Sequence, residues 1–169
     1  RLDKDTSGCQ IIAKNNKFLR VLNKLISERK VKKTYQAIVH GNWIHKDGIY
    51  EINIEKNTLI GKERMVSVSK GGKIAKTFFR VIESSKHFSL IQCELITGRT
   101  HQLRVHLSEL GFPIVGDKKY GLKENKFSQG SGYKKRMYLH ADSFLSKDLN
   151  IHINVKPPIE FKKILKNDE

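Results

Sequence analysis

Short runs of apolar and β-branched residues, joined by connections of only a few residues, make up most of this chain. The strand-like runs lie at 9–13, 34–39, 49–54, 65–69, 76–82, 88–96, 137–141 and 151–155. Several connections are too short for the crossover of about a dozen residues that joins parallel strands. The sequence therefore predicts an α+β fold, with a mixed, largely antiparallel sheet and a few helices on its faces.

Helical spacing of apolar residues predicts the helices that cover this sheet. A helix is expected over 16–30, with Asn15 or Asn16 as its N-cap and its apolar face on the sheet. Thr100 is expected to cap a second helix over 101–110. A short third helix should follow the two prolines near the C-terminus, since proline is favoured at a helix start.

The charge of the chain indicates a polyanionic partner. At 169 residues the chain is predicted to be one domain, and 33 Lys and Arg against 17 Asp and Glu give it a formal charge of +16. Nucleic acid is the leading candidate. A membrane is the rival, but no stretch approaches the roughly 20 apolar residues of a membrane span. Residues 122–136 are polar and lysine-rich, and are expected to form a mobile loop.

The two cysteines indicate where in the cell the protein works, and the first residues indicate whether the chain is a whole protein. Cys9 and Cys93 are too few and too far apart for a disulfide framework or a zinc site. Both are expected to be buried thiols in a reducing compartment, which indicates a cytoplasmic protein. The chain has no initiator methionine and begins two residues before Asp3, so it is expected to be a fragment of a longer protein.

Polar residues that a core would not require mark the candidate site. Arg104 lies next to Leu103 on the predicted second helix, at the border of its apolar face, so its guanidinium needs a carboxylate partner. Asp3 is the expected partner, because a nearby arginine keeps a desolvated aspartate ionised. His101 and His106 are five positions apart and do not share a helix face, so no metal site is predicted.

Four collinear motifs resemble the RluA-type RNA pseudouridine synthases. They are Arg-Leu-Asp-x-x-Thr-Ser-Gly at 1–8, Lys-x-Tyr-x-Ala at 33–37, Thr-Gly-Arg-x-His-Gln-x-Arg-x-His at 97–106, and Gly-Phe-Pro-Ile-x-Gly-Asp-x-x-Tyr-Gly at 111–121. Residues 63–69 are similar to the branch that acts on large-subunit ribosomal RNA, the C type. Agreement of several motifs in order makes the resemblance specific where one would be weak.

The resemblance implies a pseudouridine synthase fold and an activity without a cofactor. Residues 1–169 would be the catalytic domain, lacking its first part and the small N-terminal RNA-binding domain of many relatives. Asp3 would be the catalytic aspartate, with Asp5 as the competing carboxylate. Tyr35 would lie against the target uracil, and Arg104 would pair with the aspartate. The reaction would detach uracil from C1′ of its ribose, turn it and rejoin it through C5.

The resemblance also implies contacts with RNA around an extruded nucleotide. Arg1, Arg99 and His101 are candidate RNA contacts, and Arg1 would fill the gap that the flipped base leaves. Leu139 is expected to pack under the target base. The partner would be RNA, most plainly large-subunit ribosomal RNA, with no DNA or membrane, and the protein a monomer.

Two alternatives stay open at the level of sequence. The chain could be a synthase of the same family that acts on other ribosomal or transfer RNA uridines. It could also be a basic RNA-binding module without activity, although such a module has no need of Asp3, Tyr35 and Arg104 together. Nor does the sequence decide whether the aspartate acts as a nucleophile or as a base.

Overall fold

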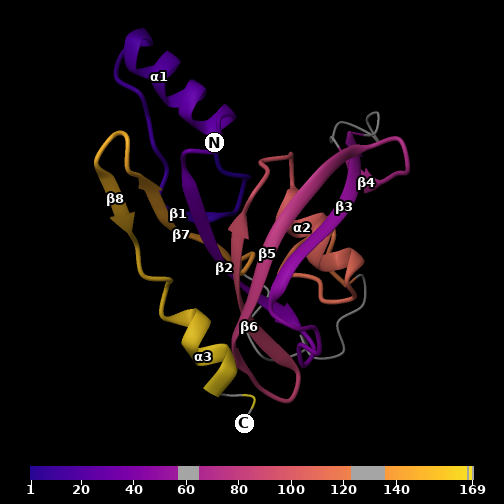
Figure 1. The fold of residues 1–169 in the computed structure, drawn as a ribbon. Coiled ribbons are helices and arrows are strands. Elements are labelled where there is room, and N and C mark those ends of the chain that lie inside the picture. Colours follow the sequence, from indigo (N-terminus) through magenta and orange to yellow (C-terminus); the bar gives the residue numbers. More distant parts are fainter. Residues whose placement is uncertain (57–64, 123–135, 167, 169) are drawn as a thin grey trace.

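A single mixed sheet organises the chain, with helices at its faces and at one end (Figure 1). The computed structural model describes residues 1–56, 65–122, 136–166 and 168. Its elements in chain order are β1 (Ser7–Gly8), α1 (Asn16–Ser27), β2 (Lys32–His40), β3 (Gly48–Lys56), β4 (Val66–Val68), β5 (Lys73–Ser84), β6 (Phe88–Leu95), α2 (Gln102–Glu109), β7 (Leu139–Ser146), β8 (Ile151–Asn154) and α3 (Glu160–Lys166).

Pairing in the sheet confirms the α+β prediction. Seven of its eight described strands run in the order β1-β7-β2-β6-β5-β3-β4, and the eighth, β8, pairs with β7 outside this order. β1 and β7 are parallel, whereas every other pair is antiparallel. The expected pair of strands on either side of residue 86 is β5 and β6. Short connections join the consecutive pairs β5–β6 and β7–β8, whereas β2 pairs with β6 and β7, which lie much further along the chain.

Successive residues of β2 face opposite sides of the sheet, and each side has its own core. Ala37 and Val39 are fully buried and pack in one cluster with Leu103 and Leu107 of α2. Ile38 is buried on the other side, in a cluster with Phe161, Ile164 and Leu165 of α3. Helices therefore cover both faces of the central strands, as Figure 1 shows.

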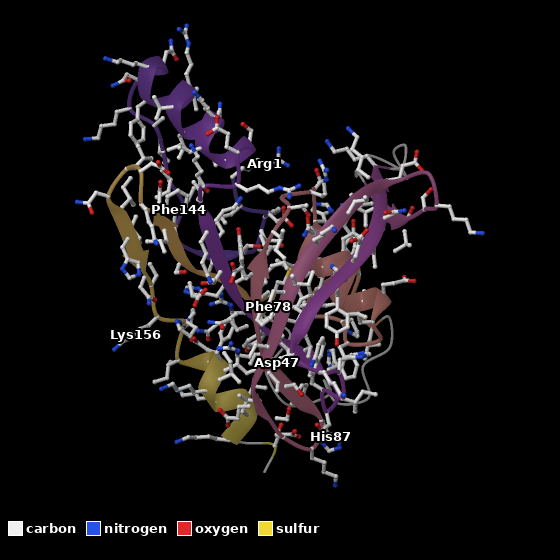
Figure 2. All side chains as sticks on the ribbon, in the orientation of Figure 1. Arg1, Asp47, Phe78, His87, Phe144 and Lys156 are labelled. Carbon is white, nitrogen blue, oxygen red and sulfur yellow. The ribbon has the colours of Figure 1, made fainter. Side chains whose placement is uncertain are left out.

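The first helix packs at one end of the sheet. The side chain of Asn15 accepts a hydrogen bond from the backbone N–H of Phe18 at 2.8 Å, which confirms the predicted N-cap. Leu22 and Leu25 pack with Val31 and Phe144. Figure 2 shows Phe144 just below α1, at the end of the molecule opposite His87.

The prediction of a strand over 9–13 is wrong. The first strand is the two-residue β1, and after Cys9 donates its N–H to the carbonyl of Ala141 at 2.9 Å the chain leaves the sheet. Cys9 and Ile11 instead pack toward the core beneath α1, so their apolar character serves burial and not pairing. Gly8 has a φ of +114°, and a Cβ there would collide with the backbone of Ala141.

The structure also bears on the predictions for the cysteines, for two segments of the chain and for a membrane span. Both cysteines are free thiols, but only Cys93 is buried and Cys9 is half-buried. Most of the predicted loop over 122–136, and the first two residues of the 63–69 segment, lie outside the described residues. Within the part of the chain that the structure describes, no helix is long and apolar enough to cross a membrane.

His106 makes the stability of this core depend on pH. It is fully buried in α2, packs edge-on against Phe79 with ring centroids 5.1 Å apart, and has no hydrogen-bond partner among the described residues. Burial lowers its pKa to about 4. Between pH 6.5 and 4 the unfolded chain therefore binds a proton that the folded chain does not, so acid destabilises the fold.

We expect the free energy of unfolding to fall by about 2–3 kcal/mol more in the wild-type protein than in His106→Leu when the pH drops from 7 to 4. Leucine fills a similar space and cannot titrate. Urea denaturation at several pH values measures the difference. Parallel pH profiles for the two proteins would show that His106 does not contribute to acid lability.

Candidate active site

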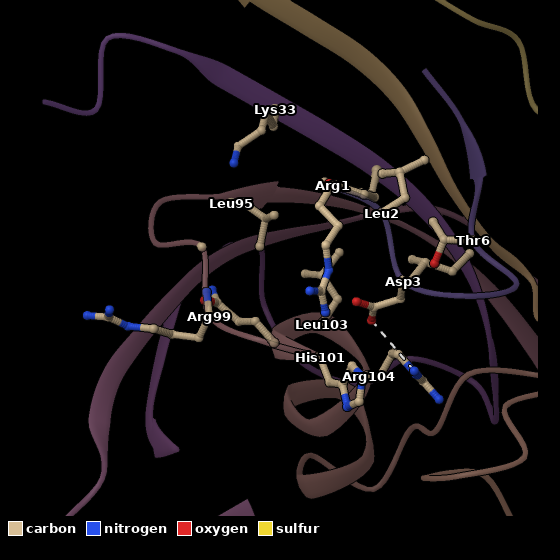
Figure 3. Close-up of a pocket in the computed structure, with 14 residues that line it drawn as sticks. Arg1, Leu2, Asp3, Thr6, Lys33, Leu95, Arg99, His101, Leu103 and Arg104 are labelled. Atoms are coloured by element: carbon tan, nitrogen blue, oxygen red, sulfur yellow. Dashed lines mark hydrogen bonds and ion pairs between the residues drawn. The ribbon is translucent and has the colours of Figure 1, made fainter. Parts of the chain in front are cut away.

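All seven residues singled out as site residues line one pocket. It lies where the N-terminal segment meets β2, the end of β6, the start of α2 and the start of β7 (Figure 3). The seven are Arg1, Asp3, Tyr35, Arg99, His101, Arg104 and Leu139. Seven residues spread over 139 positions thus converge on one place, and their roles there stay predictions.

A tight turn presents Asp3 to the pocket. The carbonyl of Asp3 accepts a hydrogen bond from the N–H of Thr6 at 3.1 Å, and Asp5 takes a left-handed conformation, with a φ of 72°. The Asp3 carboxylate lies 3.6 Å from Nη1 of Arg104, as the dashed line in Figure 3 shows. Asp5 is exposed and does not line the pocket, so it is not positioned to compete with Asp3.

Arg104 is buried between two carboxylates, of which the sequence predicted one. Its Nε and Nη2 each donate a hydrogen bond of 2.7 Å to Asp117, a closer contact than the ion pair with Asp3. Burial opposes its charge, but the hydrogen bonds and charge of Asp117, and then the charge of Asp3, raise the pKa of Arg104. Asp117 therefore fixes a permanent cation beside Asp3.

Asp117 was missed by the sequence-based selection of site residues, although it lies in the fourth motif. Its Oδ1 accepts hydrogen bonds from the backbone N–H groups of Lys119 at 2.8 Å and Tyr120 at 3.1 Å, which closes a turn. Burial raises its pKa, but the bonds from Arg104 and from these two N–H groups outweigh burial and leave the pKa lowered. The signal was the Gly-Asp-x-x-Tyr-Gly spacing, in which the aspartate bonds to its own turn.

A bulge in the neighbouring strand sits beside Tyr35. Thr34 is opposite Ser143 while Tyr35 is opposite Ala141, so Asp142 is an extra residue of β7. Asp142 is buried and accepts a hydrogen bond of 2.7 Å from the hydroxyl of Thr34. Burial, followed by the charges of Asp3 and Cys9, raises the pKa of Tyr35 to about 12, so its hydroxyl stays protonated at physiological pH.

Gln102, and not Thr100, organises the start of α2. Its side-chain oxygen accepts hydrogen bonds from the Thr97 hydroxyl at 2.8 Å and the Arg99 N–H at 2.9 Å. Its amide donates to the carbonyl of Lys76 at 2.9 Å, which ties the turn to β5. The predicted cap at Thr100 is wrong, because the helix begins after His101 and no side chain of the described residues caps it.

The remaining predicted residues form the walls and rim of the pocket. His101 has a left-handed backbone, with a φ of 52°, and its Nδ1 lies 2.8 Å from the hydroxyl of Tyr120. Figure 3 shows the Arg1 side chain reaching into the pocket between Leu95 and Asp3. Arg99 is exposed and its Nε donates to the carbonyl of Ile74 at 3.2 Å.

The pocket combines an acid with apolar and aromatic walls. Leu103 and Leu139 are each less than 6% exposed, and with Tyr35 they offer a surface on which a planar ring can lie. Arginine and lysine side chains around the opening favour an anionic ligand. In the described part of the chain, no three His, Cys, Asp or Glu residues gather as metal ligands would.

Comparison with known proteins relates this arrangement to one family. The family model described as RNA pseudouridylate synthase matches residues 1–109. The chain is 39% identical over 179 residues to ribosomal large subunit pseudouridine synthase C of Buchnera aphidicola, covering 99% of the chain and 55% of that protein. It is 38% identical over 143 residues to the protein of the same name from Escherichia coli, covering 83% of the chain and 45% of that protein. The chain thus spans about half the length of the curated relatives that it matches.

Solved structures share the fold. Human RNA pseudouridylate synthase domain containing 1 superposes with a TM-score of 0.78 at 28% identity, covering 94% of this chain and 68% of that one. Human RNA pseudouridylate synthase domain containing 4 gives a TM-score of 0.80 at 26% identity, covering 98% of this chain and 73% of that one. The resemblance noted from the motifs is confirmed, and with it the predicted fold.

Proposed function

This chain belongs to the RNA pseudouridylate synthase family, and from that membership we propose that it converts uridines of large-subunit ribosomal RNA to pseudouridine. Relatives named for the large ribosomal subunit support the choice of RNA. The observation that carries the proposal is the Asp3 carboxylate, 3.6 Å from the buried guanidinium of Arg104 in a pocket that Tyr35 also lines.

The proposed reaction is an isomerisation that needs no cofactor. The bond between N1 of uracil and C1′ breaks, a bond between C5 and C1′ forms, C5 loses its proton and N1 gains one. The Asp3 carboxylate could attack C1′ or the base, or it could remove the 2′ proton. Each route requires the carboxylate to be aimed into the pocket, where the fixed cation of Arg104 lies 3.6 Å from it.

The other residues are proposed to bind the extruded nucleotide. Flipping a nucleotide out of stacked RNA costs a few kcal/mol, which stacking and phosphate contacts must offset. Tyr35 and Leu139 would hold the base between them, and Arg1 would occupy the gap in the RNA. Arg99 and His101 would contact RNA at the rim. Uracil is a base of RNA, so RNA and not DNA is the proposed partner.

Residues 1–169 are proposed to be the catalytic domain, working as a monomer in the cytoplasm, where Cys9 and Cys93 would stay reduced. The formal charge of +16 supports binding to a polyanion. A family member that acts on another ribosomal RNA or on transfer RNA would have the same pocket. An RNA-binding module without activity would not need Arg104 fixed beside Asp3.

Tritium release tests the proposal, because the C5 proton is lost when C5 bonds to C1′. Transcripts of the large-subunit ribosomal RNA, the small-subunit ribosomal RNA and transfer RNA from the source organism are labelled at uracil C5 and incubated with the protein. We expect release from the large-subunit transcript. Tritium release from another transcript alone would show that the protein is a synthase of the same family with a different RNA substrate. RNA binding without any tritium release would favour the RNA-binding module without activity.

A further inference from the structure

Two adjacent lysines of β2 have different environments. Successive side chains of a strand point to opposite faces. Lys32 is exposed and its Nζ forms an ion pair of 2.6 Å with Glu94. Lys33 is half-buried and lines the pocket together with Tyr35, two positions along the same face. The basic run in the sequence therefore divides into a paired surface lysine and a lysine of the pocket.

Lys33 has no carboxylate partner among the residues that the structure describes. Asp3, the acid of the pocket, pairs with Arg104 instead. Burial lowers the pKa of Lys33, so its placement opposes its charge. A half-buried ammonium without a partner is costly for a fold to keep, which indicates that an external anion completes its environment.

The pocket continues into a second hollow on the far side of Lys33. Lys33, Leu95, Gly98 and Arg99 line both spaces. A Cβ on Gly98 would be in ordinary van der Waals contact with Nζ of Lys33, at 3.6 Å, so glycine at this position leaves that side of the ammonium uncovered. Figure 3 shows the Lys33 amine on the Arg99 side of Arg1, away from Asp3.

This second hollow is basic and contains no acid. Beyond the shared residues it is lined by the end of α1 and the turn that follows, including Arg29. No Asp or Glu is among its lining residues in the described part of the chain. We call the space between Arg29, Lys33, Gly98 and Arg99 the basic groove. Three cations that line one hollow, with no carboxylate among its described lining residues, favour a polyanion over a peptide of mixed charge.

We propose that Lys33 binds the phosphate next to the target nucleotide, and that the RNA strand then follows the basic groove past Arg29. This inference rests on the proposed function. The primary amine of lysine is a compact charge that suits a single phosphate oxygen. Placed at the junction of pocket and groove, it would hold the backbone where the strand turns to deliver its base, while Asp3 and Arg104 carry out the chemistry.

The salt dependence of RNA binding tests this role. The probe is a uridine-containing stem-loop RNA of large-subunit sequence, and the proteins are wild type, Lys33→Gln, Lys33→Arg and Lys32→Gln. The slope of log K against log salt is negative, and each lost contact with a single-stranded phosphate makes it shallower by about 0.7. We expect that change in Lys33→Gln, with affinity on the order of tenfold lower at low salt. Lys33→Arg and Lys32→Gln should keep the wild-type slope.

Binding and turnover distinguish failure of this inference from failure of the proposed function. At RNA concentrations below saturation, tritium release should fall in Lys33→Gln in proportion to its lost affinity, whereas Lys32→Gln, which lies outside the pocket, should release tritium within about threefold of the wild-type rate. Equal salt slopes of RNA binding for Lys33→Gln and Lys32→Gln would overturn the inference. So would a Lys33→Gln variant that loses tritium release but keeps the wild-type salt slope. A wild-type protein that shows the Lys33-dependent slope but releases no tritium would refute the function and leave the groove supported.

Discussion

Asp3→Asn should reduce tritium release from labelled RNA by on the order of 1,000-fold or more. Asparagine has nearly the same shape but cannot act as a nucleophile of comparable strength or as a base. Arg104 would keep its two hydrogen bonds to Asp117, so the variant should retain its fold and its affinity for RNA. The loss should therefore appear in the rate at saturating RNA and not in binding.

Asp5→Asn is the matched control for this variant. Asp5 is exposed, lies two positions away and has a left-handed backbone that asparagine also tolerates. Its activity should stay within about twofold of the wild type, since surface substitutions away from special features have small effects. If Asp3→Asn retained activity and Asp5→Asn lost it, the assignment of the two carboxylates would be reversed.

The predictable part of the fold follows from local patterns that match burial. Alternation in β2 places Ala37 and Val39 on one side and Ile38 on the other, so the sequence pattern indicates a strand covered on both faces. The segment 9–13 was wrongly predicted as a strand because Cys9 and Ile11 pack beneath α1 without continuing the sheet, while Ile12 is exposed. Periodicity reports that a side chain is buried, but it does not report which backbone lies beside it.

The site was predictable where a residue lies in a motif and less so where its partner depends on a loop. The motifs selected Asp3, Tyr35 and Arg104, and these three line one pocket. Asp117 holds Arg104 from a turn 13 residues further along, and the position of that turn depends on tertiary packing. The sequence indicated that Arg104 needs a carboxylate partner, but it did not indicate that two carboxylates, Asp3 and Asp117, would contact it.

The two carboxylates around Arg104 differ in exposure, so one is placed to hold the arginine and the other to meet a ligand. The Asp117 side chain is 1% exposed and the Asp3 side chain is 21% exposed. A buried acid with four accepted hydrogen bonds is fixed in place and has no free access to a substrate. Asp3 has one longer contact and faces the pocket, so it retains the freedom that a reacting group requires.

Asp117→Asn should lower the free energy of unfolding by about 3–5 kcal/mol, because it removes one member of a buried ion pair. The asparagine oxygen can still accept from the N–H groups of Lys119 and Tyr120, so the turn keeps its bonds. The new amide would take the place of Oδ2 and direct a donor at Nε of Arg104, which now donates to that oxygen at 2.7 Å, while the remaining oxygen could still accept from Nη2. Only Asp3, at 3.6 Å, would then balance the charge of Arg104.

Urea denaturation, monitored by circular dichroism, measures this change in the free energy of unfolding. Glu28→Gln is the control. Glu28 forms exposed ion pairs with Lys30 at 3.0 Å and Lys24 at 3.9 Å, so its loss should cost less than about 1 kcal/mol. Without the Asp117 carboxylate, Arg104 would also move toward Asp3 and change the position of the reacting group. The rate of tritium release should therefore fall in Asp117→Asn and stay unchanged in Glu28→Gln. Similar stabilities for the two variants would show that Asp3 and the surrounding packing hold Arg104 without Asp117.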